Sequence, residues 1–135
     1  MELNNNTVCA VLCIDAVENN ISSGRYYTGD QSREYTFSGL DRFLLEMDAL
    51  MNNQDLGESC ALLDGTIRRS GKVATFRLQI LFRRNGSWQG SVMWLETRHE
   101  EHFRSALELL SIIDQALGSA QKQRMRPSSL KITKQ

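Results

Sequence analysis

The sequence predicts an α+β fold made by internal duplication of a β-β-β-α unit. Its strands form one or more antiparallel sheets, and its two helices pack on one face of the sheet. Three observations lead to this prediction. The hydrophobic pattern changes twice from the alternation of strands to the three-four spacing of a helix. An Asn-Gly pair between two strand-like runs is typical of a hairpin, because both central residues of its turn need positive φ. Finally, the chain aligns with itself without gaps at an offset of 66 residues.

The self-alignment places residues 8–52 on residues 74–118 and gives eight identities over 45 pairs. Sequences of average composition would give about two or three. The identical pairs are Leu12/Leu78, Ile14/Ile80, Asn19/Asn85, Gly24/Gly90, Glu34/Glu100, Phe37/Phe103, Leu44/Leu110 and Asp48/Asp114. We therefore predict a duplication, although two unrelated segments with the same core-facing periodicity would also share apolar positions.

The first unit is expected to begin with three strands. Runs rich in β-branched and aromatic residues predict these strands at residues 7–14, 24–28 and 33–37. Asn19-Asn20 predicts a turn between the first two strands.

A helix is expected after the third strand. Ser38, with Asp41 three residues later, predicts its N-cap and an acid in its first turn. The apolar face of this helix is formed by Leu40, Phe43, Leu44, Met47, Leu50 and Met51.

The second unit has a clearer strand pattern. Residues 76–83 alternate between apolar and polar, which predicts a half-buried antiparallel strand. Asn85-Gly86 predicts the hairpin turn, and residues 87–96 the returning strand. Gly90 in the middle of that strand predicts a bulge or a close approach of two backbones.

A short strand at residues 101–103 and a second helix complete the unit. Ser105 and Glu108 form the pattern of a capping box at the start of this helix. Gly118 predicts its end.

These elements predict one domain over residues 1–118. Within it, residues 7–52 form the first unit, 53–71 a connector and 72–118 the second unit. Residues 119–135 are basic and polar, and we expect a disordered tail.

The net charge of zero conceals a strong asymmetry. Residues 1–66 contain eleven acidic and three basic residues, a net charge of −8, whereas residues 67–135 contain thirteen basic and five acidic residues, a net charge of +8. Such asymmetry is typical of a chain that binds an acidic partner, nucleic acid or a second copy of itself.

The hydropathy and the three cysteines indicate in which cellular compartment the protein is expected. No apolar run approaches the ~20 residues of a membrane span. Cys9, Cys13 and Cys60 lack zinc-ligand spacing, and we interpret them as reduced thiols of a cytoplasmic protein.

No catalytic motif is recognised, so we predict no enzyme, cofactor, catalytic residue or metal ligand. His99 and His102 are three residues apart in an expected strand, which would place their rings on opposite faces. Asp48 and Asp114 recur beside the two helix stripes, and we expect them to bond a neighbouring backbone amide or tyrosine rather than to act chemically.

Basic and aromatic residues gather in the second unit and form a candidate interaction surface. Rings and positive charges together are typical of single-stranded nucleic-acid binding. The alternative is that Trp88 and Trp94, which share strand parity with Val92, lie in the core. The predicted surface comprises Arg77, Arg83, Arg84, Trp88, Trp94 and Arg98.

The second unit resembles small uncharacterised proteins of clostridial-type bacteria. The resemblance lies in Ala74-Thr-Phe-Arg, Trp88-Gln-Gly and Phe103-Arg-Ser followed by a Leu-rich helix, within residues 74–117. The first half matches more weakly, through Gly24-Arg-Tyr-Tyr. The resemblance implies a bacterial, cytoplasmic setting and no established activity or site residue.

The sequence therefore favours a non-enzymatic protein–protein interaction module, a small adaptor or regulator that associates with a partner protein or with itself. Binding of RNA or single-stranded DNA is one alternative. The other is a small-molecule site between the two units, lined by Tyr26, Tyr27, Trp88 and Trp94.

Overall fold

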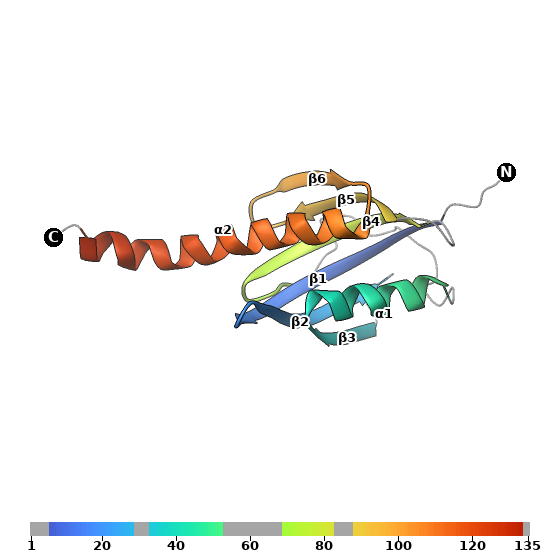
Figure 1. The fold of residues 1–135 in the computed structure, drawn as a ribbon, viewed down its shortest axis with the longest axis horizontal. Coiled ribbons are helices and arrows are strands. Elements are labelled where there is room, and N and C mark those ends of the chain that lie inside the picture. Colours follow the sequence, from blue (N-terminus) through green and yellow to red (C-terminus); the bar gives the residue numbers. More distant parts are fainter. Residues whose placement is uncertain (1–5, 29–32, 53–68, 83–87, 134–135) are drawn as a thin grey trace.

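A computed structural model places six strands in one antiparallel sheet, with two helices beside it (Figure 1). It describes residues 6–28, 33–52, 69–82 and 88–133, and side chains as far as Ala120. The predicted α+β class, antiparallel pairing, six strands and two helices are confirmed within these ranges. In chain order the elements are β1 (Asn6–Glu18), β2 (Ile21–Thr28), β3 (Arg33–Ser38), α1 (Leu40–Asn52), β4 (Ala74–Phe82), β5 (Trp88–Trp94), β6 (His99–Phe103) and α2 (Ala106–Thr133).

The central pair of strands joins the two halves of the chain. The strand order is β3-β2-β1-β4-β5-β6, so β1 and β4 are neighbours in the middle of the sheet. They are antiparallel and share nine partner pairs, from Asn6↔Phe82 to Ile14↔Ala74. The sheet is therefore continuous across both halves.

The two halves have the same strand register. Gly24 pairs with Phe37 between β2 and β3, and 66 residues later Gly90 pairs with Phe103 between β5 and β6. The registers of β1 with β2 and of β4 with β5 are related by the same offset, up to a bulge at Asp15 in β1. α1 and α2 also begin 66 residues apart.

One core cluster contains residues of both helices and of alternating strand positions. Each fully buried aliphatic or aromatic side chain contributes about 1.5–3 kcal/mol of transfer free energy. Figure 1 shows α1 alongside β1–β3 and α2 alongside β4 and β5. The fully buried members include Leu12, Tyr26, Phe43, Met47, Phe76, Leu78, Ile80, Leu109 and Ile113.

The two helices begin with different caps. The N-cap of α1 is Gly39, whose φ of 98° favours glycine and whose carbonyl accepts from Phe43 N at 3.1 Å. The predicted N-cap, Ser38, is wrong, because Ser38 is still part of β3. Asp41 does lie in the first turn.

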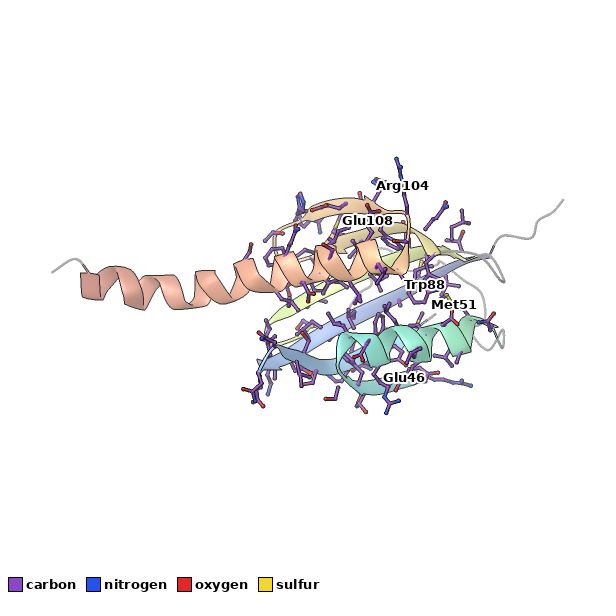
Figure 2. All side chains as sticks on the ribbon, in the orientation of Figure 1. Glu46, Met51, Trp88, Arg104 and Glu108 are labelled. Carbon is purple, nitrogen blue, oxygen red and sulfur yellow. The ribbon has the colours of Figure 1, made fainter. Side chains whose placement is uncertain are left out.

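At the N-terminus of α2, one of the two hydrogen bonds of the predicted capping box is formed. Ser105 Oγ accepts from Glu108 N at 3.1 Å, as expected. Glu108 Oε1 accepts from Arg104 N at 2.6 Å, one residue before the amide that a capping box uses. Figure 2 shows Arg104 and Glu108 together at this end of α2.

The predicted end of the second helix is wrong. α2 continues through Gly118 to Thr133. The disordered tail over residues 119–135 stays a prediction. Figure 1 shows this part of α2 extending beyond the end of the sheet. Neither helix in the described ranges is long and apolar enough to cross a membrane.

The first predicted turn is confirmed. Asn19 and Asn20 have φ of 54° and 67°, and they connect the paired residues Glu18 and Ile21. This is the two-residue hairpin geometry that asparagine tolerates. The Asn85-Gly86 turn and residues 53–68 of the connector lie outside the described residues.

Gly24 and Gly90 lie where two backbones approach closely, as predicted for Gly90. A Cβ at Gly90 would overlap the carbonyl oxygen of Gln79, and one at Gly24 would overlap that of Cys13. Any other residue would therefore force the neighbouring strand to move.

We predict that Gly90→Ala lowers the free energy of unfolding by about 1–3 kcal/mol, because the strand pair must shift to admit a methyl group. Gly118→Ala provides the matched control. Nothing lies within 4 Å of a Cβ at Gly118, so this helical position should gain about 0.5–1 kcal/mol. Urea unfolding of both variants measures the two effects. Equal effects would contradict the close approach at Gly90.

Candidate functional site

Trp88 is part of the core and does not lie on a surface. Its side chain is only 5% exposed. Its indole Nε1 donates to Asp48 Oδ1 at 3.2 Å, so a residue of the second unit bonds one of the first. Figure 2 shows Trp88 beside Met51, near the end of α1. The predicted partner of Asp48, a backbone amide or a tyrosine, is wrong, because its carboxylate accepts from Trp88 Nε1 and from Asn52 Nδ2. Asp114 is exposed.

Trp94 lies on the same side of the sheet but is only half-buried. Its ring packs against Phe76, with ring centres 6.3 Å apart. Its Nε1 is buried and has no hydrogen-bond partner within the described part of the chain. The two tryptophans therefore differ, because only Trp88 has its indole N–H satisfied.

The predicted arginines do not join the tryptophans on one surface. Arg77 points to the opposite side of the sheet, where its Nη2 is 3.2 Å from Glu100 Oε2. Arg98 is exposed in the turn between β5 and β6, with a φ of 60°. Arg83 and Arg84 lie outside the described residues. The structure thus divides the four described residues of the predicted surface among the core, a turn and the opposite face.

The predicted pocket between the units is not formed by its four aromatic residues. Tyr26 and Tyr27 are consecutive in β2 and therefore lie on opposite faces. Tyr26 stacks on Tyr35 with ring centres 4.9 Å apart, and its hydroxyl donates to Glu46 Oε1 at 2.8 Å. Burial raises the pKa of Tyr26, and the bond to Glu46 adds to that effect.

A charged network on the face opposite the core was not predicted. Asp15 accepts from Arg25 Nε at 2.8 Å and from Arg25 Nη2 at 3.0 Å. Arg25 Nη1 donates to the Tyr27 hydroxyl at 2.8 Å, and that hydroxyl donates to Glu34 Oε1 at 2.7 Å. The guanidinium of Arg69 lies 5.0 Å from the centre of the Tyr27 ring. The network thus joins β1, β2, β3 and the segment that leads into β4.

The network links the strands of the first unit to one another, and it also links the first unit to the segment that begins the second. Arg25 Nη2 also donates to the carbonyl of Ser70 at 2.9 Å, and Asp15 Oδ1 accepts from Lys72 N at 3.1 Å. The Arg25 hydrogen bonds hold the pKa of Asp15 below its usual value, while burial raises the pKa of Tyr27. A bidentate arginine–carboxylate pair of this kind fixes geometry as well as charge.

The cysteines are not equivalent. Cys13 is free and buried, and burial raises its pKa to about 11, so its thiolate is scarce at neutral pH. Cys9 is disulfide-bonded, so the prediction of three reduced thiols is wrong. Disulfides persist mainly in oxidising compartments. The cysteines therefore no longer support a cytoplasmic setting, which stays a prediction.

The two histidines lie as the strand parity predicts. His99 pairs with Trp94 and His102 with Ser91, which places their side chains on opposite faces of β6. His99 Nε2 is 2.9 Å from Glu101 Oε2, and both side chains are largely exposed. No group of three potential metal-ligating side chains occurs among the residues with described positions.

A pocket of about 180 Å³ lies between α2 and strands β4, β5 and β6. Apolar side chains line most of it, and polar ones from β6 and α2 complete it. The lining residues are Phe76, Val92, Trp94, His99, Glu101, Ile112, Gln115, Ala116 and Ser119. Of the residues predicted to take part in binding, only Trp94 lines this pocket. Trp94 is also the residue whose buried Nε1 has no hydrogen-bond partner in the described part of the chain.

Comparisons of the chain with protein-family models, with curated protein sequences and with solved structures give no match.

We predict that Asp48→Ala lowers the free energy of unfolding by about 1–3 kcal/mol, because the buried indole N–H of Trp88 loses its acceptor. Asp114→Ala is the matched control, since it makes the same change at the equivalent, exposed position. The control should change stability by no more than about 0.5 kcal/mol. Urea unfolding followed by tryptophan fluorescence measures the difference. Similar losses in the two variants would show that the Trp88 bond contributes nothing.

We predict that Asp15→Asn costs about 1–3 kcal/mol of stability at pH 7, because it breaks the paired bonds with Arg25. Folding lowers the pKa of Asp15, so this stability is present above the unfolded pKa of about 4 and is lost as pH falls through the folded value. Wild type and variant should therefore converge in urea unfolding near pH 2. A difference that stays constant between pH 7 and pH 2 would argue against an ionised Asp15 as its source.

Proposed function

We propose that the protein is a non-enzymatic protein–protein interaction module that uses the projecting part of α2 as a binding arm. This arm comprises residues 121–133. The supporting observation is that α2 continues to Thr133, well past the part of the helix that packs on the sheet (Figure 1). Thirteen helical residues span about 20 Å, and Figure 1 shows them extending away from the sheet.

The composition of the arm indicates what its partner would be. It contains Lys122, Arg124, Arg126 and Lys131 and no acidic residue. Isolated helices of this length are marginal in water, so contact with a partner would stabilise the arm. An acidic surface matches its charge, and such matching favours both specificity and fast association.

A second copy of the chain offers a suitable acidic surface. The first unit, residues 7–52, contains seven acidic and three basic residues, a net charge of −4, and Glu18, Glu34 and Asp41 are exposed on it. If the arm of one copy binds the first unit of another, the contact is heterologous and head-to-tail. We therefore propose self-association, because a second copy of the chain itself supplies the acidic surface that the arm would bind.

Nucleic-acid binding is a second candidate that the same arm supports. Counter-ion release would then make binding fall steeply with salt. Burial of Trp88 weighs against the proposed hairpin surface, because a buried ring cannot stack on a base. The small-molecule alternative depends on a different location, the pocket beside α2.

We further propose that the two units arose by duplication and that both helices pack on one face of the sheet. Supporting observations are the shared register of the two halves and the presence of both helices in one core cluster. A pseudo-two-fold arrangement of this kind places the acidic first unit, with a net charge of −4 over residues 7–52, and the second unit, with a net charge of +1 over residues 72–118, on opposite sides of the central strand pair.

The mass in solution at low salt and in about 1 M salt, where the screening length falls to about 3 Å, tests self-association. We expect a mass above the monomer at low salt and a monomer at high salt. A chain ending at Ala120 and a Lys122→Glu/Arg124→Glu/Arg126→Glu variant should be monomeric in both. The matched control is Arg124→Lys, which keeps the charge.

A wild-type monomer at both salt concentrations would rule out self-association. A mobility shift with single-stranded RNA at low salt, lost in the charge-reversed variant, would instead favour nucleic acid as the partner.

A further inference from the structure

The pocket beside α2 lies in a unit that shares its strand register with the first, so its lining can be compared with the first unit position by position. At three lining positions the second unit has the smaller side chain. The residues 66 positions before Val92, Glu101 and Ala116 are Tyr26, Tyr35 and Leu50.

In the first unit these larger side chains occupy the corresponding space. Tyr26 is fully buried, stacks on Tyr35 and makes an edge contact with Phe43 at 5.0 Å between ring centres. Leu50 packs against the same core. At these three positions the second unit has Val92, Glu101 and Ala116, and a pocket lies between them. Its two aromatic lining residues, Phe76 and Trp94, stand instead where the first unit has Ala10 and Thr28.

The remaining residues show what chemistry the space would accept. Phe76, Val92 and Ile112 supply apolar walls. Trp94 supplies a buried N–H that has no acceptor within the described part of the chain. An unpaired buried donor is unfavourable, so a ligand that supplies an acceptor to it gains affinity.

The size of the pocket limits the ligand to one small ring. A cavity of about 150 Å³ in a protein core can hold benzene, and this pocket is about 180 Å³. Drug-sized molecules need larger pockets, of about 300 Å³ or more. His99 and Glu101, 2.9 Å apart, are the pair in the lining that can bond a polar substituent.

We propose that this pocket binds a single-ring aromatic compound with a carbonyl substituent, such as an aromatic amide or ketone. The ring occupies the space that Tyr26 and Tyr35 fill in the first unit. The carbonyl oxygen accepts from Trp94 Nε1. In an amide, the N–H₂ group donates to the Glu101 carboxylate. This site is independent of the arm of α2 and of its partner.

Benzamide is the probe, and the two indole N–H signals in a ¹⁵N–¹H correlation spectrum are the readout. The protein has two tryptophans, so Trp94→Phe assigns both signals. Titration with benzamide should shift the Trp94 signal in a saturable way. The Trp88 signal is the internal control and should stay in place, because its N–H is bonded to Asp48.

The role of the N–H is tested with toluene, which fills the same space without an acceptor. We expect it to bind about fivefold more weakly than benzamide, as the loss of one hydrogen bond predicts. Equal affinities would overturn the assigned contact with Trp94 Nε1.

The location of the benzamide site is tested by replacing residues that line the pocket with the larger residues at the equivalent positions of the first unit. Ala116→Leu places the equivalent of Leu50 in the space, and we expect it to weaken benzamide at least tenfold. Glu101→Tyr, at an exposed position of β6, is a second variant with the same expected effect and little demand on the core. Ser111→Leu, on the exposed side of α2, is the control and should bind as the wild type does.

Two results would overturn the proposal. One is an unchanged Trp94 signal at millimolar benzamide in the full-length protein. The other is wild-type affinity in a folded Ala116→Leu or Glu101→Tyr variant, because either side chain would occupy the site.

Discussion

The pairing of β1 with β4 is the constraint on which the rest of the structure depends. A three-stranded sheet with one helix is marginal alone, because it cannot cover enough apolar surface. The nine partner pairs between these strands make one sheet of two such units and align their apolar faces. Both helices then share one core cluster. The Trp88–Asp48 bond between the units is possible only because this pairing brings β5 and α1 to the same core.

The equal register of the two halves makes their differences informative. On the core side, Tyr26 and Tyr35 fill the first unit, whereas Val92 and Glu101 leave a pocket in the second. On the opposite face, Tyr27 is bonded within a network around Arg25, whereas its counterpart Met93 cannot form polar bonds of that kind. The first unit thus has stacked tyrosines and a polar network at these positions, whereas the second has a pocket and, at Trp94, a buried donor without an acceptor in the described part of the chain.

Local patterns were sufficient where a property depends on neighbours in the sequence. Strand alternation, the Asn19-Asn20 turn and the close approach at Gly90 follow from short-range geometry, and the structure confirms them. The end of α2 could not be predicted this way, because a solitary glycine weakens a helix by only about 1 kcal/mol and neighbouring turns can continue through it. The residues of the candidate surface lie apart for another reason. The prediction combined side chains by their chemistry, whereas alternate strand positions place Arg77 and Trp88 on opposite faces.

The sequence alone determined the element types, their order, the antiparallel pairing and the positions equivalent under the 66-residue offset, since these depend on periodicity and on the requirements of individual turns. The tertiary structure decided the strand order, the partner of Asp48, the Asp15–Arg25 network and the pocket at Trp94. Each of these features forms where two or more segments distant in the sequence come into contact, and a local sequence pattern does not predict which segments make that contact. Whether a space between them is filled depends on the summed volumes of side chains from several elements.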